Sequence, residues 1–304
     1  MIVPPLRIVA LEVTRTCDLA CRHCRGDSRR EDYPDELAFS EIRDTLHNIA
    51  AFARPILIIT GGEPLTRPDV YDIAALSASL GFRTALATCG HLLDDDTVPR
   101  LKTAGVMRVS VSLDGAEAST HDRFRGTPGA FEAALRGIGA LRRHGLEFQV
   151  NSTLTRLNIA ELPKLHDLAL SLGAAGFHPF LLVPMGRGRG LADNALDPEA
   201  YEDALIKIAL MAERSPLEIK PTCGPHYIRV VARLRAAAYA SPSGAKPRAG
   251  GREHPPAPLS MTRGCLGGQG FVFISHRGAV QICGFLEIPA GDLRAEKYDL
   301  KKIW

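Results

Sequence analysis

The stretch RIVALEVTRTCDLACRHC (residues 7–24) is a short apolar run that passes directly into three closely spaced cysteines. The apolar run is rich in aliphatic and β-branched residues, which predicts a buried strand of a parallel sheet. Similar runs follow it, separated by longer stretches whose apolar residues recur at the spacing of one helix face. This alternation predicts parallel strands joined by right-handed helical crossovers. The predicted strands are 7–13, 56–60, 83–88, 108–113, 148–154 and 177–183.

The predicted fold class is therefore α/β. Periodicity by itself fits both a curved partial barrel and an open doubly wound sheet, and both carry ligand sites at the carboxyl ends of their strands. Beyond residue 183 the pattern changes, and helices are expected at 198–213 and 225–239. Asp197 is the expected N-cap of the first of these helices, because it stands directly before Pro198.

The last part of the chain is expected to be a small extension. Residues 241–260 are rich in Pro, Gly and Ser, which predicts a flexible linker. The runs 271–275 and 279–283 flank the turn HRG and predict a β-hairpin, and a helix is expected to start at the final residues. We expect three segments, namely a core over 1–197, a helical basic segment over 198–262, and a hairpin-containing extension over 263–304.

Composition limits the function classes. The chain has 304 residues, of which 45% are hydrophobic and 23% charged, so it can bury a core and is neither disordered nor fibrous. Its formal net charge of +3 does not indicate nucleic-acid binding. No apolar run reaches the roughly 18 residues that a membrane span requires. The N-terminus lacks the features of a secretory signal, so a cytoplasmic location is expected.

Three of the seven cysteines, Cys17, Cys21 and Cys24, follow the first predicted strand directly. In a reducing compartment, clustered thiols indicate metal ligands rather than disulfides. Three thiolates in one loop suit an iron–sulfur cluster and leave one iron open to another ligand. The alternative is a zinc site, which needs a fourth ligand such as His23.

A second motif, Gly61-Gly62-Glu63-Pro64, follows the second predicted strand. Two glycines permit close approach to the backbone, and the glutamate offers a carboxylate to a cation. The order of the two motifs, C-x3-C-x2-C after the first strand and GGEP after the second, resembles the radical S-adenosylmethionine (radical SAM) superfamily. The resemblance implies a partial (β/α)6 barrel of the TIM type.

The resemblance also implies the cofactors. The three cysteines would hold a [4Fe-4S] cluster whose fourth iron is chelated by SAM. Gly61, Gly62, Glu63 and Pro64 would lie against the SAM amino group, and His23 would stack beside the adenine. One-electron reduction would cleave SAM to methionine and a 5′-deoxyadenosyl radical, which abstracts a hydrogen atom from substrate.

Four further residues are expected at the same site. The resemblance assigns polar contacts with SAM to Ser112 and Asp114, although the motif SLDG also suits a helix N-cap. Arg125 would pair with the SAM carboxylate or with an acid on the surface. Asn151 on the fifth strand would hydrogen-bond to SAM or to the backbone. Cys89 is expected to be a small buried residue and no ligand.

The C-terminal extension contains Cys265, then Gly278, then Cys283, at the spacing that opens the SPASM extension of radical SAM enzymes. This resemblance implies an auxiliary [4Fe-4S] cluster in a complete chain. The further cysteines of a SPASM extension do not follow Cys283 in this sequence. Either the chain is truncated, which we expect, or the auxiliary site is incomplete.

Several phrases, including FLLVPMGRGRG (180–190) and CGPHY (223–227), resemble the radical SAM enzymes of late heme synthesis. That group includes the heme b synthase, which decarboxylates two propionates of iron-coproporphyrin III to vinyl groups. Residues 214–263 hold nine Lys or Arg against two Glu, which suits an anionic porphyrin or only a solvated linker. The candidate substrate residues are Arg187, Arg189 and His226, and for Cys223 a buried position at a helix start is expected.

Other functions stay open at this point. Within the same group they are the didecarboxysiroheme deacetylase and the heme d1 pathway enzyme. Outside it they are a SPASM-type enzyme that modifies peptides, and a non-catalytic metal-binding scaffold. As a radical SAM enzyme the protein would need an electron donor such as flavodoxin or ferredoxin.

Overall fold

The computed structural model describes residues 3–240 and 264–304. The first seven strands are β1 (Ile8–Thr14), β2 (Ile56–Gly61), β3 (Arg83–Thr88), β4 (Val106–Ser112), β5 (Phe148–Leu154), β6 (Gly176–Leu181) and β7 (Glu218–Ile219). The last three are β8 (Phe271–Ile274), β9 (Ala279–Cys283) and β10 (Leu286–Asp292). All ten form one sheet in the order β10-β9-β8-β1-β2-β3-β4-β5-β6-β7. The six predicted core strands are confirmed, with their bounds shifted by at most two residues.

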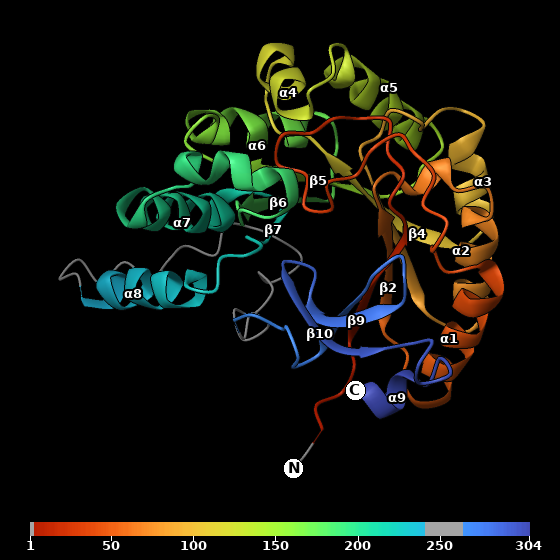
Figure 1. The fold of residues 1–304 in the computed structure, drawn as a ribbon. Coiled ribbons are helices and arrows are strands. Elements are labelled where there is room, and N and C mark those ends of the chain that lie inside the picture. Colours follow the sequence, from red (N-terminus) through yellow and green to blue (C-terminus); the bar gives the residue numbers. More distant parts are fainter. Residues whose placement is uncertain (1–2, 241–263) are drawn as a thin grey trace.

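Strands β1 to β7 pair in parallel with their neighbours in sequence order. Strand β8 joins the other edge of β1 in parallel, and β9 and β10 continue the sheet in antiparallel pairs. The predicted hairpin is therefore confirmed and extends the core sheet. Within the described residues, β10 and β7 end the order without pairing with each other, so the sheet is curved and open (Figure 1).

Helices cover the outer side of this sheet (Figure 1). They are α1 (Phe39–Phe52), α2 (Val70–Ser79), α3 (Thr97–Thr103), α4 (Ala118–Arg125), α5 (Ala130–Arg143) and α6 (Leu162–Ser171). The later helices are α7 (Pro198–Arg214), α8 (Tyr227–Ala240) and α9 (Leu300–Ile303), and three short 3-10 helices are η1 (Pro64–Thr66), η2 (Ile159–Glu161) and η3 (Gly186–Asn194). Asp197 caps α7 as predicted, because its side chain accepts a hydrogen bond from the backbone N–H of Ala200. Among the helices in the described ranges, none is long and apolar enough to cross a membrane.

The structure adds elements that periodicity did not indicate. Residues 186–194, expected as loop, form η3, and the two-residue strand β7 and the strand β10 were not predicted. The helix expected at the chain end starts earlier, at Leu300. The linker predicted at 241–260 lies outside the described residues.

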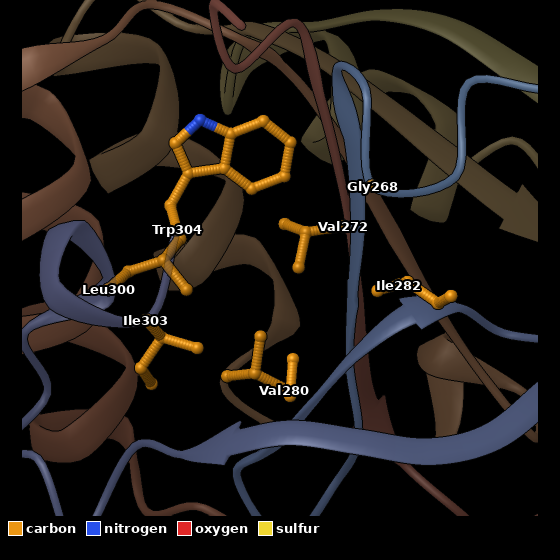
Figure 2. A pocket seen from close by; sticks show the side chains of 8 residues that line it. Gly268, Val272, Val280, Ile282, Leu300, Ile303 and Trp304 are labelled. Carbon is orange, nitrogen blue, oxygen red and sulfur yellow. The ribbon is translucent and has the colours of Figure 1, made fainter. Parts of the chain in front are cut away.

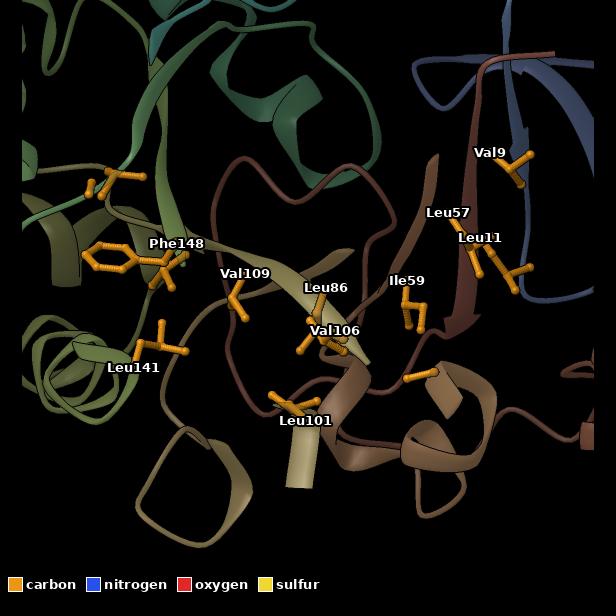
Figure 3. Close-up of a cluster of buried hydrophobic side chains, with 14 of the residues drawn as sticks. Val9, Leu11, Leu57, Ile59, Leu86, Leu101, Val106, Val109, Leu141 and Phe148 are labelled. Carbon is orange, nitrogen blue, oxygen red and sulfur yellow. The ribbon is translucent and has the colours of Figure 1, made fainter. Parts of the chain in front are cut away.

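One continuous apolar core lies between the sheet and the helices. Fully buried aliphatic residues alternate along the first strands, for example Val9 and Leu11 on β1 and Leu57 and Ile59 on β2 (Figure 3). Their burial against the helices explains why aliphatic residues occupy alternate positions of these strands.

A second apolar contact joins the ends of the chain. Leu300, Ile303 and Trp304 face Val272 and Val280 of the hairpin around a small apolar cavity (Figure 2). The Trp304 indole N–H donates to the backbone carbonyl of Pro4 at 2.9 Å. The α9 segment therefore anchors the hairpin to the first strand.

A buried carboxylate joins β1 to the segments on either side of it. Glu12 is fully buried on β1, and its carboxylate lies 2.6 Å from Arg25 Nη2 and 3.2 Å from Arg15 Nη2. From the hairpin turn, His276 contributes its backbone N–H at 3.1 Å and its Nδ1 at 2.8 Å. Burial raises the pKa of Glu12, but the His276 hydrogen bond and the two arginines outweigh it and lower the pKa to about 2.

Replacing Glu12 should remove a pH-dependent part of the stability of the apoprotein. The ordinary pKa of 4.5 applies when unfolded and about 2 when folded, so the carboxylate stabilises the fold fully above about pH 4.5. That contribution, about 3 kcal/mol from the shift, is lost as the pH falls toward 2. Urea unfolding of Glu12→Gln and wild type should show a stability gap at neutral pH that narrows below about pH 4.5.

The exposed Glu147, which pairs with Arg108, offers a matched control. Glu147→Gln should follow the wild-type pH curve. A gap between Glu12→Gln and wild type that stays constant down to acidic pH would contradict the role of the Glu12 carboxylate.

Candidate active site

A cavity opens at the carboxyl ends of the core strands. It has a volume of about 1000 Å³ including its open mouth, which is the size of a small-molecule site. Residues of the cysteine loop (residues 15–29), the ends of β2 to β6 and the start of η3 line it. The predicted site residues on its wall are Cys17, Cys21, His23, Cys24, Gly61, Gly62, Ser112, Asp114, Arg125, Asn151 and Arg187.

The remaining predicted residues lie outside the described lining of this cavity. They are Glu63, Pro64, Arg189, His226, Cys265 and Cys283. Arg189 is exposed and lies 3.7 Å from the Glu287 carboxylate. His226 is exposed beside Tyr201, with ring centroids 6.1 Å apart. Their assigned roles stay predictions.

Two segments, the loop after β2 and the start of η3, pack directly against the backbone of the cysteine loop. At Gly62 an added Cβ would lie 2.4 Å from the Thr16 carbonyl oxygen, so only glycine lets the β2 loop approach this closely. At Gly186, whose φ is +50°, an added Cβ would lie 2.5 Å from the Cys24 carbonyl oxygen. The Arg187 side chain donates to the carbonyl oxygens of Cys21 at 2.8 Å and Ser28 at 2.6 Å. The loop therefore has one defined conformation.

The three thiols of this loop lie in apolar surroundings. Cys17 and Cys21 are buried, and Cys24 is partly buried against them. Burial raises the pKa of Cys17 to about 12 and also raises the pKa of Cys21. Free thiols here would stay protonated at neutral pH, whereas a coordinating metal deprotonates them. The donor set of three closely grouped sulfurs fits an iron–sulfur cluster.

The Glu63 carboxylate is fully buried and directed toward the end of β3. It accepts hydrogen bonds from the Thr88 hydroxyl at 2.8 Å, the Cys89 backbone N–H at 2.9 Å and the Leu65 N–H at 3.1 Å. In this arrangement Glu63 fixes the end of β3, and Thr88 and Cys89 in turn line the cavity.

A buried ion pair crosses the cavity wall. Arg125 Nη2 lies 2.7 Å from Asp114 Oδ2, and both side chains are buried, so the interpretation of Arg125 as a solvated surface cation is wrong. Burial raises the pKa of Asp114, but Arg125 and His23 outweigh it and lower the pKa. Helix α4 begins at Ala118 with Glu117 at its N-cap position, so SLDG is not a helix N-cap, and Asp114 instead accepts from the Thr153 N–H at 2.7 Å.

His23 and Arg125 connect this pair to the cysteine loop. His23 Nε2 lies 3.3 Å from Asp114 Oδ2, and burial lowers the pKa of His23 to about 4, so its ring is neutral at pH 7. Arg125 Nη1 donates to the Cys21 sulfur at 3.6 Å. A guanidinium directed at a cluster ligand would stabilise negative charge on that sulfur.

Three buried nitrogens around the cavity have no hydrogen-bond partner in the described part of the chain. They are Nδ1 of His23, Nε of Arg125 and Nη2 of Arg187. All three residues line the cavity, so these nitrogens are available to a polar, anionic ligand. Asn151 also lines it, with its Oδ1 accepting from the Gln149 amide at 3.0 Å. Together with the thiols, this polar wall fits a cluster with SAM.

Sequence reasoning missed a chain of side chains at the end of β3. Cys89 is buried as expected, and its sulfur lies 2.8 Å from Glu63 Oε2 and 2.9 Å from His91 Nδ1. His91 Nε2 lies 3.3 Å from Asp18 Oδ2 in the cysteine loop. The signal in the sequence was the pair Cys89 and His91 at the end of a strand.

A further cysteine also has neighbours that spacing did not indicate. Cys223 has a positive φ of 57° and lies just before α8. Burial, together with the nearby thiols of Cys283 and Cys265, raises the pKa of Cys223 to about 12. The fold thus brings together three cysteines that are far apart in the sequence.

The comparisons with known proteins agree with this geometry. Residues 11–169 match the radical SAM superfamily. The chain belongs to the radical SAM superfamily. The matched residues include the cysteine loop, the GGEP motif and most of the cavity wall, so the predicted family and fold class are confirmed.

Curated relatives are similar to this radical SAM chain, and the heme synthases among them cover nearly its whole length. The AdoMet-dependent heme synthase of Nitratidesulfovibrio vulgaris is 40% identical over 99% of this chain and 79% of its own length. That of Methanosarcina barkeri is 43% identical over 98% of this chain and 82% of its own. The pre-heme d1 synthase of Dinoroseobacter shibae is 38% identical over 71% of this chain and 54% of its own.

Among solved structures, Streptococcus suis SuiB bound to the precursor peptide SuiA aligns with a TM-score of 0.74 at 18% identity. The alignment covers 100% of this chain and 65% of that one. The likeness concerns the fold. It extends across both the core sheet and the added hairpin of this radical SAM protein.

Replacing Asp114 should destabilise the fold strongly. Asp114→Asn leaves the buried Arg125 guanidinium without its countercharge, which should cost about 3–5 kcal/mol in the free energy of unfolding. Chemical denaturation of the apoprotein measures this free energy.

Asp95→Asn is the matched control, because Asp95 pairs with Arg143 at an exposed position. It should leave the unfolding curve nearly unchanged. Equal, small effects of both substitutions would show that the Asp114–Arg125 pair does not support the site.

Proposed function

We propose that this protein is a heme synthase of the radical SAM type. It would decarboxylate two propionates of iron-coproporphyrin III oxidatively to vinyl groups, giving heme b. The observation that carries the proposal is identity of 40–43% with AdoMet-dependent heme synthases over 98–99% of this chain. The cavity supports it with three grouped thiols and unpartnered cationic nitrogens on one wall.

In this proposal each part of the cavity wall has a task. Cys17, Cys21 and Cys24 hold a [4Fe-4S] cluster. When bound, the cluster and SAM supply the one-electron chemistry that generates a hydrogen-abstracting radical. The chain positions these groups and excludes water from them.

The polar residues of the wall orient SAM. Gly61 and Gly62 allow the amino acid part of SAM to approach the backbone, and Ser112 and Asn151 provide polar contacts. The His23 ring lies beside the adenine, with Asp114 holding it in place. Arg125 offers its free Nε to a carboxylate.

We further propose an auxiliary [4Fe-4S] cluster at Cys223, Cys265 and Cys283. Cys265 and Cys283 both lie against Gly267, where an added Cβ would meet Cys265 Sγ at 3.5 Å and Cys283 Cβ at 3.8 Å. Both thiols also raise the pKa of Cys223, which supports the grouping of the three, although sequence spacing indicated only Cys265 and Cys283. Each decarboxylation to a vinyl group leaves one electron to remove, and a cluster there would accept it. A cytoplasmic flavodoxin or ferredoxin would supply the electron that starts the reaction.

The porphyrin is anionic, and cationic residues suit it. Arg187 carries a buried Nη2 with no partner in the described residues, and its side chain lines the cavity. Arg189 and His226 lie outside the cavity lining and would meet only the outer part of a large substrate. Arg229 and Arg233 of α8 already pair with Glu202, so part of the basic charge is neutralised within the protein.

The second candidate is the formation of a heme d1 precursor. The relative named pre-heme d1 synthase supports it at 38% identity, but over a smaller share of this chain than the heme synthases. The consumed porphyrin distinguishes the two reactions.

The first test is an anaerobic assay of the reconstituted protein. With iron-coproporphyrin III, SAM and dithionite, we expect 5′-deoxyadenosine and a porphyrin that has lost two carboxyl groups, both measured by mass spectrometry. The change follows because each propionate loses CO2 as it becomes a vinyl group.

Other outcomes of this assay have defined meanings. Formation of 5′-deoxyadenosine with unchanged porphyrin would reject this substrate and direct the test to siroheme-derived tetrapyrroles. Absence of bound iron, with zinc in its place, would support a metal-binding scaffold instead.

Iron content separates the two proposed cluster sites. Changing Cys17 to Ala should remove about four irons per chain and abolish SAM cleavage. Changing Cys283 to Ala should also remove about four irons but leave SAM cleavage intact. Iron analysis and 5′-deoxyadenosine formation measure the two effects.

Cys89→Ala is the control, since Cys89 is a buried cysteine on the same cavity wall and is not proposed as a ligand. It should keep the full iron content. If Cys283→Ala binds as much iron as wild type, the auxiliary cluster is ruled out.

A further inference from the structure

Arg25 lies between the two groups of cysteines. It follows Cys24 directly in the cysteine loop. Its Nη1 donates to the carbonyl oxygen of Gly284 at 3.3 Å, and Gly284 follows Cys283 directly. One side chain therefore connects a residue next to the first cysteine group with a residue next to the second.

Two further contacts fix the Arg25 guanidinium. Its Nη2 lies 2.6 Å from Oε1 of the fully buried Glu12 on β1. Its Cζ stacks over the Phe273 ring of β8, 4.4 Å from the centroid. Arg25 and Phe285 both line the cavity of the candidate active site. The guanidinium is thus oriented by β1, by β8 and by the turn that follows β9.

At the Glu12 carboxylate, the arginine side chains in contact outnumber the single acidic group. Glu12 carries one negative charge and contacts two arginines, Arg15 and Arg25. Clusters held by thiolates become more negative when they gain an electron, so a nearby positive charge favours the reduced form. A side chain fixed between two such sites would influence both.

We propose that Arg25 is a positioning residue that ties the Cys283 turn to the cysteine loop and supplies positive charge between two iron–sulfur sites. The proposal rests on the proposed function, in which both groups of cysteines hold clusters. It assigns to Arg25 a role that neither cysteine motif indicates. Arg25 sets the separation of the two sites and raises their reduction potentials.

Two substitutions separate the hydrogen bond from Arg25 to the Cys283 turn from the positive charge of its side chain. Arg25→Gln removes the positive charge and the guanidinium that contacts two partners at once. Arg25→Lys keeps the charge but cannot contact Glu12 and Gly284 with one planar group. Arg22→Gln is the matched control, because Arg22 lies in the same loop and is exposed. Each variant is measured first as apoprotein and then after reconstitution.

In the apoprotein, the alkylation rate of each cysteine measures whether Arg25 holds the Cys283 turn in place. Cys283 should react about tenfold faster in both Arg25 variants than in wild type, the change expected from losing one hydrogen bond to a charged group. In the control Arg22→Gln, Cys283 should react at the wild-type rate.

In the reconstituted protein, a redox titration followed by EPR reports the charge. At a fixed potential, Arg25→Gln should reduce the ratio of reduced to oxidised cluster by roughly tenfold, whereas Arg25→Lys and Arg22→Gln should stay close to wild type. A merely structural role would not shift the potential of Arg25→Gln relative to that of Arg25→Lys.

If Arg25→Gln fails to fold, the double variant Glu12→Gln with Arg25→Gln replaces it in the alkylation test, because it removes both members of the buried ion pair. Wild-type alkylation rates and potentials in the Arg25 variants would overturn the proposal. If wild type holds only one cluster, the proposed auxiliary site fails, and the alkylation rates still decide whether Arg25 ties the turn.

Discussion

The buried carboxylate of Glu12 is the interaction on which the arrangement of the site depends. A charge at a fully buried position is costly unless cationic and hydrogen-bonding partners surround it. Glu12 obtains those partners from the cysteine loop, through Arg15 and Arg25, and from the hairpin turn, through His276. The first strand can therefore be buried only when the loop and the hairpin are both in place.

The same reasoning explains why the cysteine loop has a defined conformation. Its carbonyl groups are contacted by Arg187, and its backbone is approached closely at Gly62 and Gly186, where any side chain would collide. Thiols that must converge on one cluster need such support, since the cluster imposes positions on its ligands but not on the chain between them. The unpartnered nitrogens on the cavity wall are the complementary feature, because they are oriented before a ligand arrives.

Most of the fold could be predicted from local patterns. Strands such as β1 and β2 are recognisable because burial selects aliphatic residues, and α7 begins where Asp197 can cap it. Strand β7 escaped prediction because it has two residues and pairs only through its backbone with β6. Strand β10 is largely exposed, contains Pro289 and Gly291, and pairs with β9 in an irregular register, so its sequence did not predict a strand.

For this protein, the sequence by itself determined the radical SAM family and the cysteines of the first site. Both follow from short motifs, whose residues lie close together in the sequence and can be recognised without knowledge of the fold. Only the tertiary structure decided that Arg125 is buried against Asp114 and that Cys223 has Cys265 and Cys283 as neighbours. Those contacts depend on which loops come together at the carboxyl ends of the strands. Contacts between residues far apart in the sequence cannot be predicted from local patterns.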